Sequence, residues 1–176
     1  MDYQMQGIPD SLAEGLLILF VGYNPSLRSG VLGHNYAGRG NRFWKLLHES
    51  GLTEKLLEPS NDRDLLAQGY GFTNIVDRPT RRADEITRQE YAAGRVKLRE
   101  KLATYRPRIV CYVGKGVYEQ FTGHRYIPWG VQPQDTVQGT IDFVAPSSSG
   151  LVRMPFEDIR HIYEELKKLA DTLRKG

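Results

Sequence analysis

The feature that most constrains the fold is a short, uninterrupted apolar run, Leu16–Val21, followed at once by Gly22-Tyr23-Asn24-Pro25-Ser26. An apolar run of this length, bounded by Gly and Pro, predicts a β-strand that is buried on both faces. Asn-Pro is turn chemistry, and the residue before a proline is disfavoured in the helical region, so the strand must end near Gly22. Asn24 is therefore expected at the carboxyl end of a buried strand, where open α/β sheets bind their ligands.

A polar amide fixed at that position by a proline can orient a water molecule or a base. Taken alone, however, this motif favours a simpler explanation, an Asx-turn that only ends the strand. The two interpretations have to be separated by the rest of the chain.

Strand-like and helix-like segments alternate along the chain, which is typical of a parallel sheet covered by helices on both faces. We therefore expect an α/β fold, a three-layer α/β/α arrangement with a mostly parallel central sheet, in a single domain over residues 1–176. The apolar runs predict strands at 16–22, 70–76, 109–113 and 141–144, and helical spacing predicts helices after Asn41, from the Thr87–Glu90 capping box, after Gly114 and from Pro155.

Three further segments have weaker patterns. The connection from Leu27 to Gly40 is rich in glycine and has no apolar period, so it is expected to be a long loop, and such loops are usually functional. Residues 52–68 are expected to form short helical pieces capped by Asn61 or Asp62. Residues 1–15 are expected to be a lead-in with one turn of helix.

Composition narrows the class of protein. An apolar content of 40% with 26% charged residues excludes disorder and a coiled coil. The apolar runs are too short to cross a bilayer and no leader precedes them, so we expect a cytoplasmic protein, without a membrane partner, and a monomer. The single cysteine, Cys111, excludes a cysteine-held zinc or iron–sulfur site, and the four histidines are scattered, so no metal and no cofactor are expected. A net charge of +3 permits a nucleic-acid partner without establishing one.

Glycine- or serine-rich turns follow three of the predicted strands, at 22–26, 114–116 and 146–150. The carboxyl ends of parallel strands meet at one edge of a sheet, so these turns are expected to converge on one site. Gly114-Lys115-Gly116 offers backbone amides and a cation that suit a phosphate. The segment matches neither a Walker motif nor G-x-G-x-x-G, and a tight turn explains it equally well.

Other candidates each have an ordinary explanation beside the functional one. No G-x-S-x-G elbow surrounds Ser147-Ser148-Ser149, which disfavours a serine hydrolase. The alternative role for these serines is that their small hydroxyl side chains let a phosphate backbone approach closely. Tyr36 lies in a glycine-rich segment and can be a stacking platform for a nucleobase or a ring that holds the loop to the core. Leu151 and Arg153 have the character of a wedge and a guanine-reading cation, or of a plain loop before a helix.

Together these segments resemble the mismatch-specific uracil-DNA glycosylases of bacteria and the catalytic domain of thymine-DNA glycosylase. The resemblance extends from about Leu16 to Leu173, and the order and spacing of the motifs make it specific although each motif is weak alone. The motifs are Gly22-Tyr23-Asn24-Pro25, Gly33-His34-Asn35-Tyr36, Gly40-Asn41-Arg42-Phe43-Trp44-Lys45, Gly71-Phe72-Thr73-Asn74, Gly114-Lys115 and Pro146-Ser147-Ser148-Ser149-Gly150-Leu151.

The resemblance implies a glycosylase that flips uracil, or thymine, out of a mismatch with guanine in double-stranded DNA and hydrolyses its N-glycosidic bond, leaving an abasic site for base excision repair. It implies that Asn24 positions the attacking water and that Ser147 assists at the sugar. The base pocket would include Gly22 and Tyr23, whose backbone N–H groups would stabilise the departing base, together with His34, Tyr36 and Asn74, whereas DNA would be contacted by Lys115, Ser148, Ser149, Gly150, Leu151 and Arg153.

The chain departs from the family pattern at two positions. Tyr23 stands where relatives usually have a smaller aliphatic residue, and Ser26 where they usually have glycine. Tyr23 can narrow the pocket against thymine, whereas Ser147 agrees with the thymine-type motif. The catalytic turn contains no lysine, which predicts a monofunctional enzyme.

Other classes stay open at this stage. A glycosylase for another base, such as hypoxanthine or an oxidised pyrimidine, would share these residues and differ in pocket shape. A non-catalytic DNA-damage-binding module would have no need of Asn24. A nucleotide-binding enzyme is the weakest alternative, because no phosphate motif has the required spacing.

Overall fold

The computed structural model describes residues 7–176 and has one five-stranded sheet in the order β2-β1-β3-β5-β4. Four strands are parallel, and only the short β4 runs antiparallel, to β5. The expected α/β class with a mostly parallel sheet is confirmed. The strands are β1 (Ile18–Gly22), β2 (Tyr70–Asn74), β3 (Ile109–Val113), β4 (Gly130–Val131) and β5 (Ile141–Ala145).

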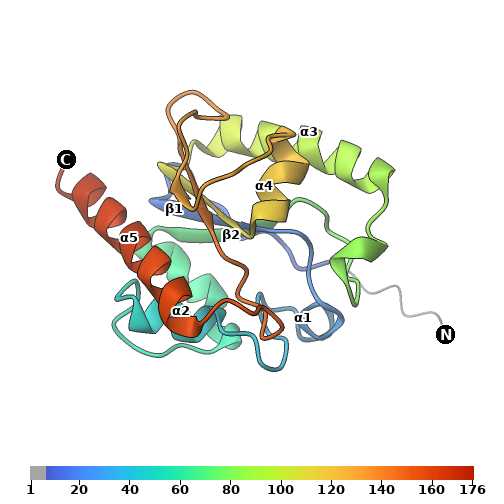
Figure 1. Cartoon of the computed structure of the whole chain (residues 1–176), viewed down its shortest axis with the longest axis horizontal. Coiled ribbons are helices and arrows are strands. Elements are labelled where there is room, and N and C mark those ends of the chain that lie inside the picture. Colours follow the sequence, from blue (N-terminus) through green and yellow to red (C-terminus); the bar gives the residue numbers. More distant parts are fainter. Residues whose placement is uncertain (1–6) are drawn as a thin grey trace.

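Helices cover both faces of the sheet, so the molecule has the expected three layers (Figure 1). One face packs against α3 (Arg88–Tyr105) and α4 (Lys115–Thr122), and the other packs against α2 (Phe43–Glu49) and α5 (Phe156–Arg174). The central strand β1 is buried on both sides because its successive side chains enter different cores. Phe20 joins the α2–α5 core, whereas Leu19 joins the α3–α4 core.

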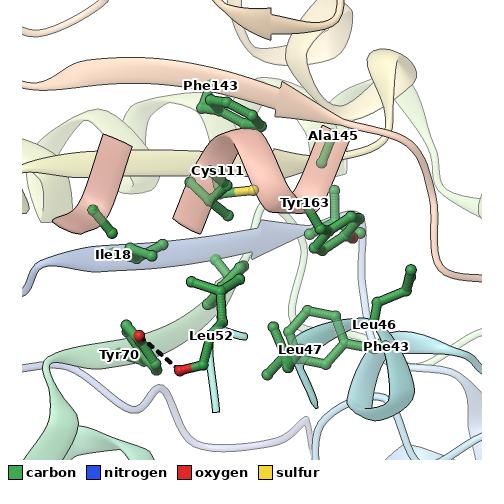
Figure 2. Close-up of a cluster of buried hydrophobic side chains, with 14 of the residues drawn as sticks. Ile18, Phe43, Leu46, Leu47, Leu52, Tyr70, Cys111, Phe143, Ala145 and Tyr163 are labelled. Atoms are coloured by element: carbon green, nitrogen blue, oxygen red, sulfur yellow. Dashed lines mark hydrogen bonds between the residues drawn. The ribbon is translucent and has the colours of Figure 1, made fainter. Parts of the chain in front are cut away.

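Figure 2 shows the core on the α2–α5 side, where Phe43 and Leu47 of α2 and Tyr163 of α5 lie against residues of the strands. The hydroxyl of Tyr70 is satisfied by the Leu52 carbonyl at 2.9 Å. Cys111 is fully buried in this core, and burial raises the pKa of its thiol. The sulfur is therefore a packing element, as the sequence indicated.

The structure corrects the expectation of a loop over 27–40, because that segment begins with a short helix, α1 (Leu27–Leu32). The Ser26 hydroxyl caps this helix by accepting a hydrogen bond from the Ser29 backbone at 3.1 Å, and Gly33 ends it in the left-handed region. The helix has no apolar stripe because its side chains are mostly exposed, so periodicity could not reveal it.

Segment 59–68 is a 3₁₀ helix, η1 (Pro59–Gln68), and a second one, η2 (Ala83–Glu85), precedes α3. The cap of η1 is a reciprocal pair between Glu58 and Asn61, so Asn61 takes part in the capping, whereas Asp62 points into the protein. Residues 7–15 contain no helical turn, and the helix expected within 1–15 is wrong for them. Residues 1–6 lie outside the described part. Within 7–176, no helix is long and apolar enough to span a membrane.

Candidate active site

A cavity of about 400 Å³ opens at the carboxyl edge of the sheet, where the sequence placed a site. It lies between the ends of β1 and β2, the glycine-rich segment after α1, the 80–83 segment and the serine loop after β5. The predicted site residues that line it are Gly22, Tyr23, Asn24, Tyr36, Asn74, Ser147, Ser148, Ser149 and Leu151.

The side-chain amide of Asn24 is fixed in orientation by two hydrogen bonds. Its nitrogen donates to the Arg78 carbonyl at 2.7 Å and to the Thr80 hydroxyl at 2.8 Å. The Thr80 hydroxyl donates its own proton to a backbone carbonyl, so its oxygen is free to accept from Asn24. Oδ1 of Asn24 has no hydrogen-bond partner among residues 7–176 and is left as an acceptor in the cavity wall. An amide is no general base, but an acceptor held this way can orient a water molecule.

Gly22 has no side chain, and this leaves room for two polar side chains at the inner end of the cavity. Gly22 is paired with Asn74 in the register of β1 and β2. A Cβ atom at Gly22 would lie 2.7 Å from Oδ1 of Asn74 and 3.3 Å from the Tyr36 hydroxyl oxygen. Glycine therefore lets two polar side chains converge on the end of β1, where they can meet the polar edge of a base.

Tyr36 holds its loop to the core and also lines the cavity. Its ring stacks on Phe43 with centroids 4.0 Å apart and an interplanar angle of 17°, and its backbone is in the left-handed region at φ 54°. Burial raises the pKa of the Tyr36 hydroxyl, so this group is neutral at physiological pH. The ring therefore holds the loop to the core, as one of the two sequence interpretations predicts, and stacking on a nucleobase stays a prediction.

His34 lies outside the cavity lining. Its Nδ1 is 3.1 Å from a carboxylate oxygen of the buried Asp62, which also accepts the backbone N–H of Asn35 at 2.8 Å. The Asn35 carbonyl in turn accepts from the Trp44 ring nitrogen at 3.3 Å. This network fixes the segment that presents Tyr36.

Tyr23 extends from the cavity toward the start of α4. Its hydroxyl oxygen would lie 1.5 Å from a Cβ atom at Gly116, so the ring fits only because that residue is glycine. Burial, with smaller effects from Tyr91 and Glu119, raises the pKa of Tyr23 to about 12. The ring also borders a neighbouring cavity of about 600 Å³ between α3 and α4, so Tyr23 lies between the two cavities.

The serine loop is held by its own hydroxyls and by the glycine-rich segment. The Ser147 and Ser149 hydroxyls accept hydrogen bonds from the backbone N–H groups of Ser149 and Leu151, at 3.3 and 3.2 Å. A Cβ at Gly150 would lie 2.7 Å from the Gly40 carbonyl oxygen, so the two loops touch backbone to backbone. Leu151, in contrast, is 92% exposed at the mouth of the cavity.

Four predicted site residues lie outside the lining: His34, Lys115, Gly150 and Arg153. The Lys115 ammonium lies 4.1 Å from the centroid of the Trp129 ring, a cation–π contact at the first residue of α4. Arg153 is exposed beyond the serine loop. The glycine turn at 114–116 thus borders the site without lining it, and its nearest lining residues are Tyr23 and Ser147.

Sequence reasoning missed Thr80, which lies just beyond the strand predicted over 70–76. The sole available signal was a hydroxyl residue after the Asp77-Arg78-Pro79 turn. The other lining residues that were not predicted as site residues are Ile8, Pro25, Ser26, Ser29, Asn35, Asn41, Arg81, Arg82, Ala83 and Val113.

Comparisons with known proteins identify the fold and the family. A solution NMR structure of a protein from Methanosarcina acetivorans, provisionally described as a uracil DNA glycosylase, matches with a TM-score of 0.64 at 21% sequence identity, over 95% of this chain and 98% of that one. This similarity establishes the fold. The sequence model of the Uracil DNA glycosylase superfamily matches residues 9–168. The chain therefore belongs to the uracil DNA glycosylase superfamily, a group of hydrolases that act on N-glycosyl bonds.

Proposed function

We propose that this protein is a monofunctional glycosylase of the mismatch-specific uracil and thymine type. It removes uracil paired with guanine from double-stranded DNA, with thymine as a second substrate to be tested. The proposal is supported by the motifs around Asn24, Tyr36 and Ser147, which resemble those of that branch of the superfamily. It also rests on the cavity that these motifs line together.

The observation that carries the mechanism is the fixed amide of Asn24. A flipped nucleotide would place its base toward Asn74 and Tyr36 and its sugar near Asn24. Oδ1 of Asn24 would accept a hydrogen bond from a water molecule and hold it against C1′ of the sugar. The water oxygen forms the new bond to C1′, and the base leaves as an anion with the electrons of the glycosidic bond. The proton released by the water passes through solvent to that anion, which gives a neutral free base and an abasic sugar.

Other residues would assist in ways that their positions allow. Backbone N–H groups near Gly22 and Tyr23 would stabilise the negative charge on the departing base. Ser147 would assist at the sugar, and Leu151 would enter the space left in the base stack. Lys115, Ser149 and Arg153 would contact phosphates or the orphaned guanine, which makes binding sensitive to salt.

The experiment is a cleavage assay on matched duplexes containing G·U, G·T, A·U or hypoxanthine, with single-stranded uracil DNA alongside. Hot alkali reveals abasic sites. We expect release from G·U that is lost in Asn24→Ala and kept in Gln138→Ala, an amide-to-alanine control on an exposed loop. Borohydride should trap no covalent adduct.

Release of another base but not uracil would reassign the substrate. DNA binding without release from any duplex would favour a damage-binding module. Such a module has no use for the fixed amide of Asn24.

A further inference from the structure

The amide of Asn24 fills a bulge in the chain that follows β2. Beyond the ends of β1 and β2 the two segments continue side by side, with the Val76 N–H bonded to the Tyr23 carbonyl at 2.9 Å and the Thr80 N–H bonded to the Pro25 carbonyl at 3.2 Å. Three residues, 77–79, therefore lie opposite the single residue Asn24. The Arg78 carbonyl at the centre of this bulge is the group that accepts from Asn24 at 2.7 Å.

The same Arg78 reaches outward to the start of α3. Its guanidinium makes a two-point contact with the carboxylate of Glu90, at 2.6 and 3.1 Å, and also donates to the Glu85 carbonyl at 3.0 Å. Glu90 is itself fixed, since its carboxylate accepts the Thr87 N–H at 2.8 Å in the capping box of α3. Arg78 thus links a rigid helix end to the backbone that orients the catalytic amide.

This link is better suited to positioning than to stability. Exposed ion pairs contribute little to the free energy of unfolding, and the Arg78 side chain is 51% exposed. A two-point arginine–carboxylate contact nevertheless imposes a defined geometry. The bulge has no strand ladder to fix it, so the contact with Glu90 restrains the Arg78 carbonyl from the solvent side.

We infer that Arg78 and Glu90 form a clamp that positions the amide of Asn24 for attack by water, so both are positioning residues for the reaction. The inference rests on the proposed function of Asn24. In the competing interpretation, Arg78 is simply a cation that contacts a DNA phosphate.

Glu90→Gln separates the two interpretations. Glutamine keeps the capping box but loses the charge that pairs with Arg78. Misplacement of a catalytic group by about 1 Å can cost as much as 100-fold, so we expect single-turnover release from G·U to slow by roughly tenfold or more. The Kd for DNA should stay the same or decrease, because removal of an anion cannot weaken binding to phosphates.

Arg78→Lys is the second variant. It keeps the positive charge and loses the two-point contact, so the clamp predicts slow release with an unchanged Kd. A phosphate contact predicts near-normal release. Glu164→Gln is the control, because it removes one of the two carboxylates that pair with Arg160 on α5, away from the cavity, and it should leave release unchanged.

A direct readout is the side-chain ¹⁵N–¹H pair of Asn24 in NMR spectra, which should shift and lose exchange protection in Glu90→Gln while thermal unfolding shows a folded protein. Release at the wild-type rate in Glu90→Gln, or unchanged Asn24 signals, would overturn the clamp. If the wild-type protein releases no base from any duplex, the proposed function fails instead, and the NMR result still decides whether the clamp orients Asn24.

Discussion

The side-chain nitrogen of Asn24 lies 2.8 Å from the hydroxyl oxygen of Thr80, whose proton is directed to the Arg82 carbonyl 2.7 Å away. This chain of hydrogen bonds runs in one direction only, because a backbone carbonyl cannot donate. Thr80 therefore has to accept from Asn24, and Asn24 cannot rotate its amide without losing two bonds. A hydroxyl placed after the turn of β2 thus determines which atom of Asn24 faces the cavity.

Removal of this hydroxyl should impair the chemical step. Thr80→Val keeps the shape of the side chain but leaves the half-buried Asn24 nitrogen with one partner fewer, a loss of about 0.5–1.5 kcal/mol, so release from G·U should slow by roughly two- to tenfold. Thr80→Ser should retain most of the rate. Single-turnover kinetics on a G·U duplex measures both, and equal rates for the two variants would contradict the role of the hydroxyl.

Because Tyr23 and Gly116 are in close contact, the effect of a substitution at one of them on the free energy of unfolding should depend on the residue at the other. Gly116→Ala would place a methyl group where the Tyr23 hydroxyl lies, and overpacking of this kind costs about 1–3 kcal/mol. In a Tyr23→Ala background the same substitution should cost nothing, because the clash is gone and alanine is the better helix former. Urea unfolding of the four proteins measures the coupling. A Gly116→Ala cost that is the same in both backgrounds would show that the ring moves away freely.

Leu151 should be needed for base release from duplex DNA, but neither for stability nor for release from single-stranded DNA. The side chain is 92% exposed, so Leu151→Ala should change the free energy of unfolding by less than about 0.5 kcal/mol. A wedge that fills the gap in a base stack is needed only where a stack exists, so release from duplex G·U should decrease while release from single-stranded uracil DNA is unaffected. Leu56→Ala, at a position that is 62% exposed, is the control. Equal losses on both substrates would argue against a wedge.

The ion pair of Glu90 predicts a pH dependence of stability. The hydrogen bond from Arg78, followed by that from the Thr87 backbone, lowers the pKa of Glu90 from 4.5 to about 2. A lowered carboxyl pKa stabilises the folded state above pH 4.5, and this contribution disappears as the pH falls toward 2. Glu90→Gln should therefore be slightly less stable than wild type at pH 6, since an exposed pair contributes little, and this small gap should narrow at pH 3. Urea unfolding at the two pH values checks this, and a gap independent of pH would contradict it.

Strong local patterns made most of the fold predictable. The strand Ile109–Val113 and the capping box of Thr87 and Glu90 lie where the sequence placed them, because apolar runs and caps act locally. Asn41 also acts as a cap, accepting the Phe43 N–H at 3.0 Å, although the helix itself is counted from Phe43. The strand β4 was not predicted, since two residues carry no pattern and the pairing with β5 is tertiary.

The place of Asn24 could be predicted because it follows closely on a buried strand, whereas Asn74, the last residue of β2, was indicated only by the family resemblance. The site could not be predicted where the orientation of a side chain depends on a partner far away in the sequence, as for His34, which contacts the Asp62 carboxylate instead of lining the cavity. The same limit applies to the Arg78 carbonyl, because no side-chain type signals that a backbone oxygen will accept from Asn24. Sequence motifs indicate where such a site lies, whereas the hydrogen bonds that orient its side chains are known only from the three-dimensional structure.

The parallel order of the strands has a consequence for the synthesis of this protein. Asn24 emerges from the ribosome early, but the serine loop that closes the cavity lies more than 120 residues later, beyond β5. A nascent chain that has made only β1, β2 and β3 therefore has Asn24 but lacks one wall of the cavity. The cavity can close only after nearly the whole chain has been made.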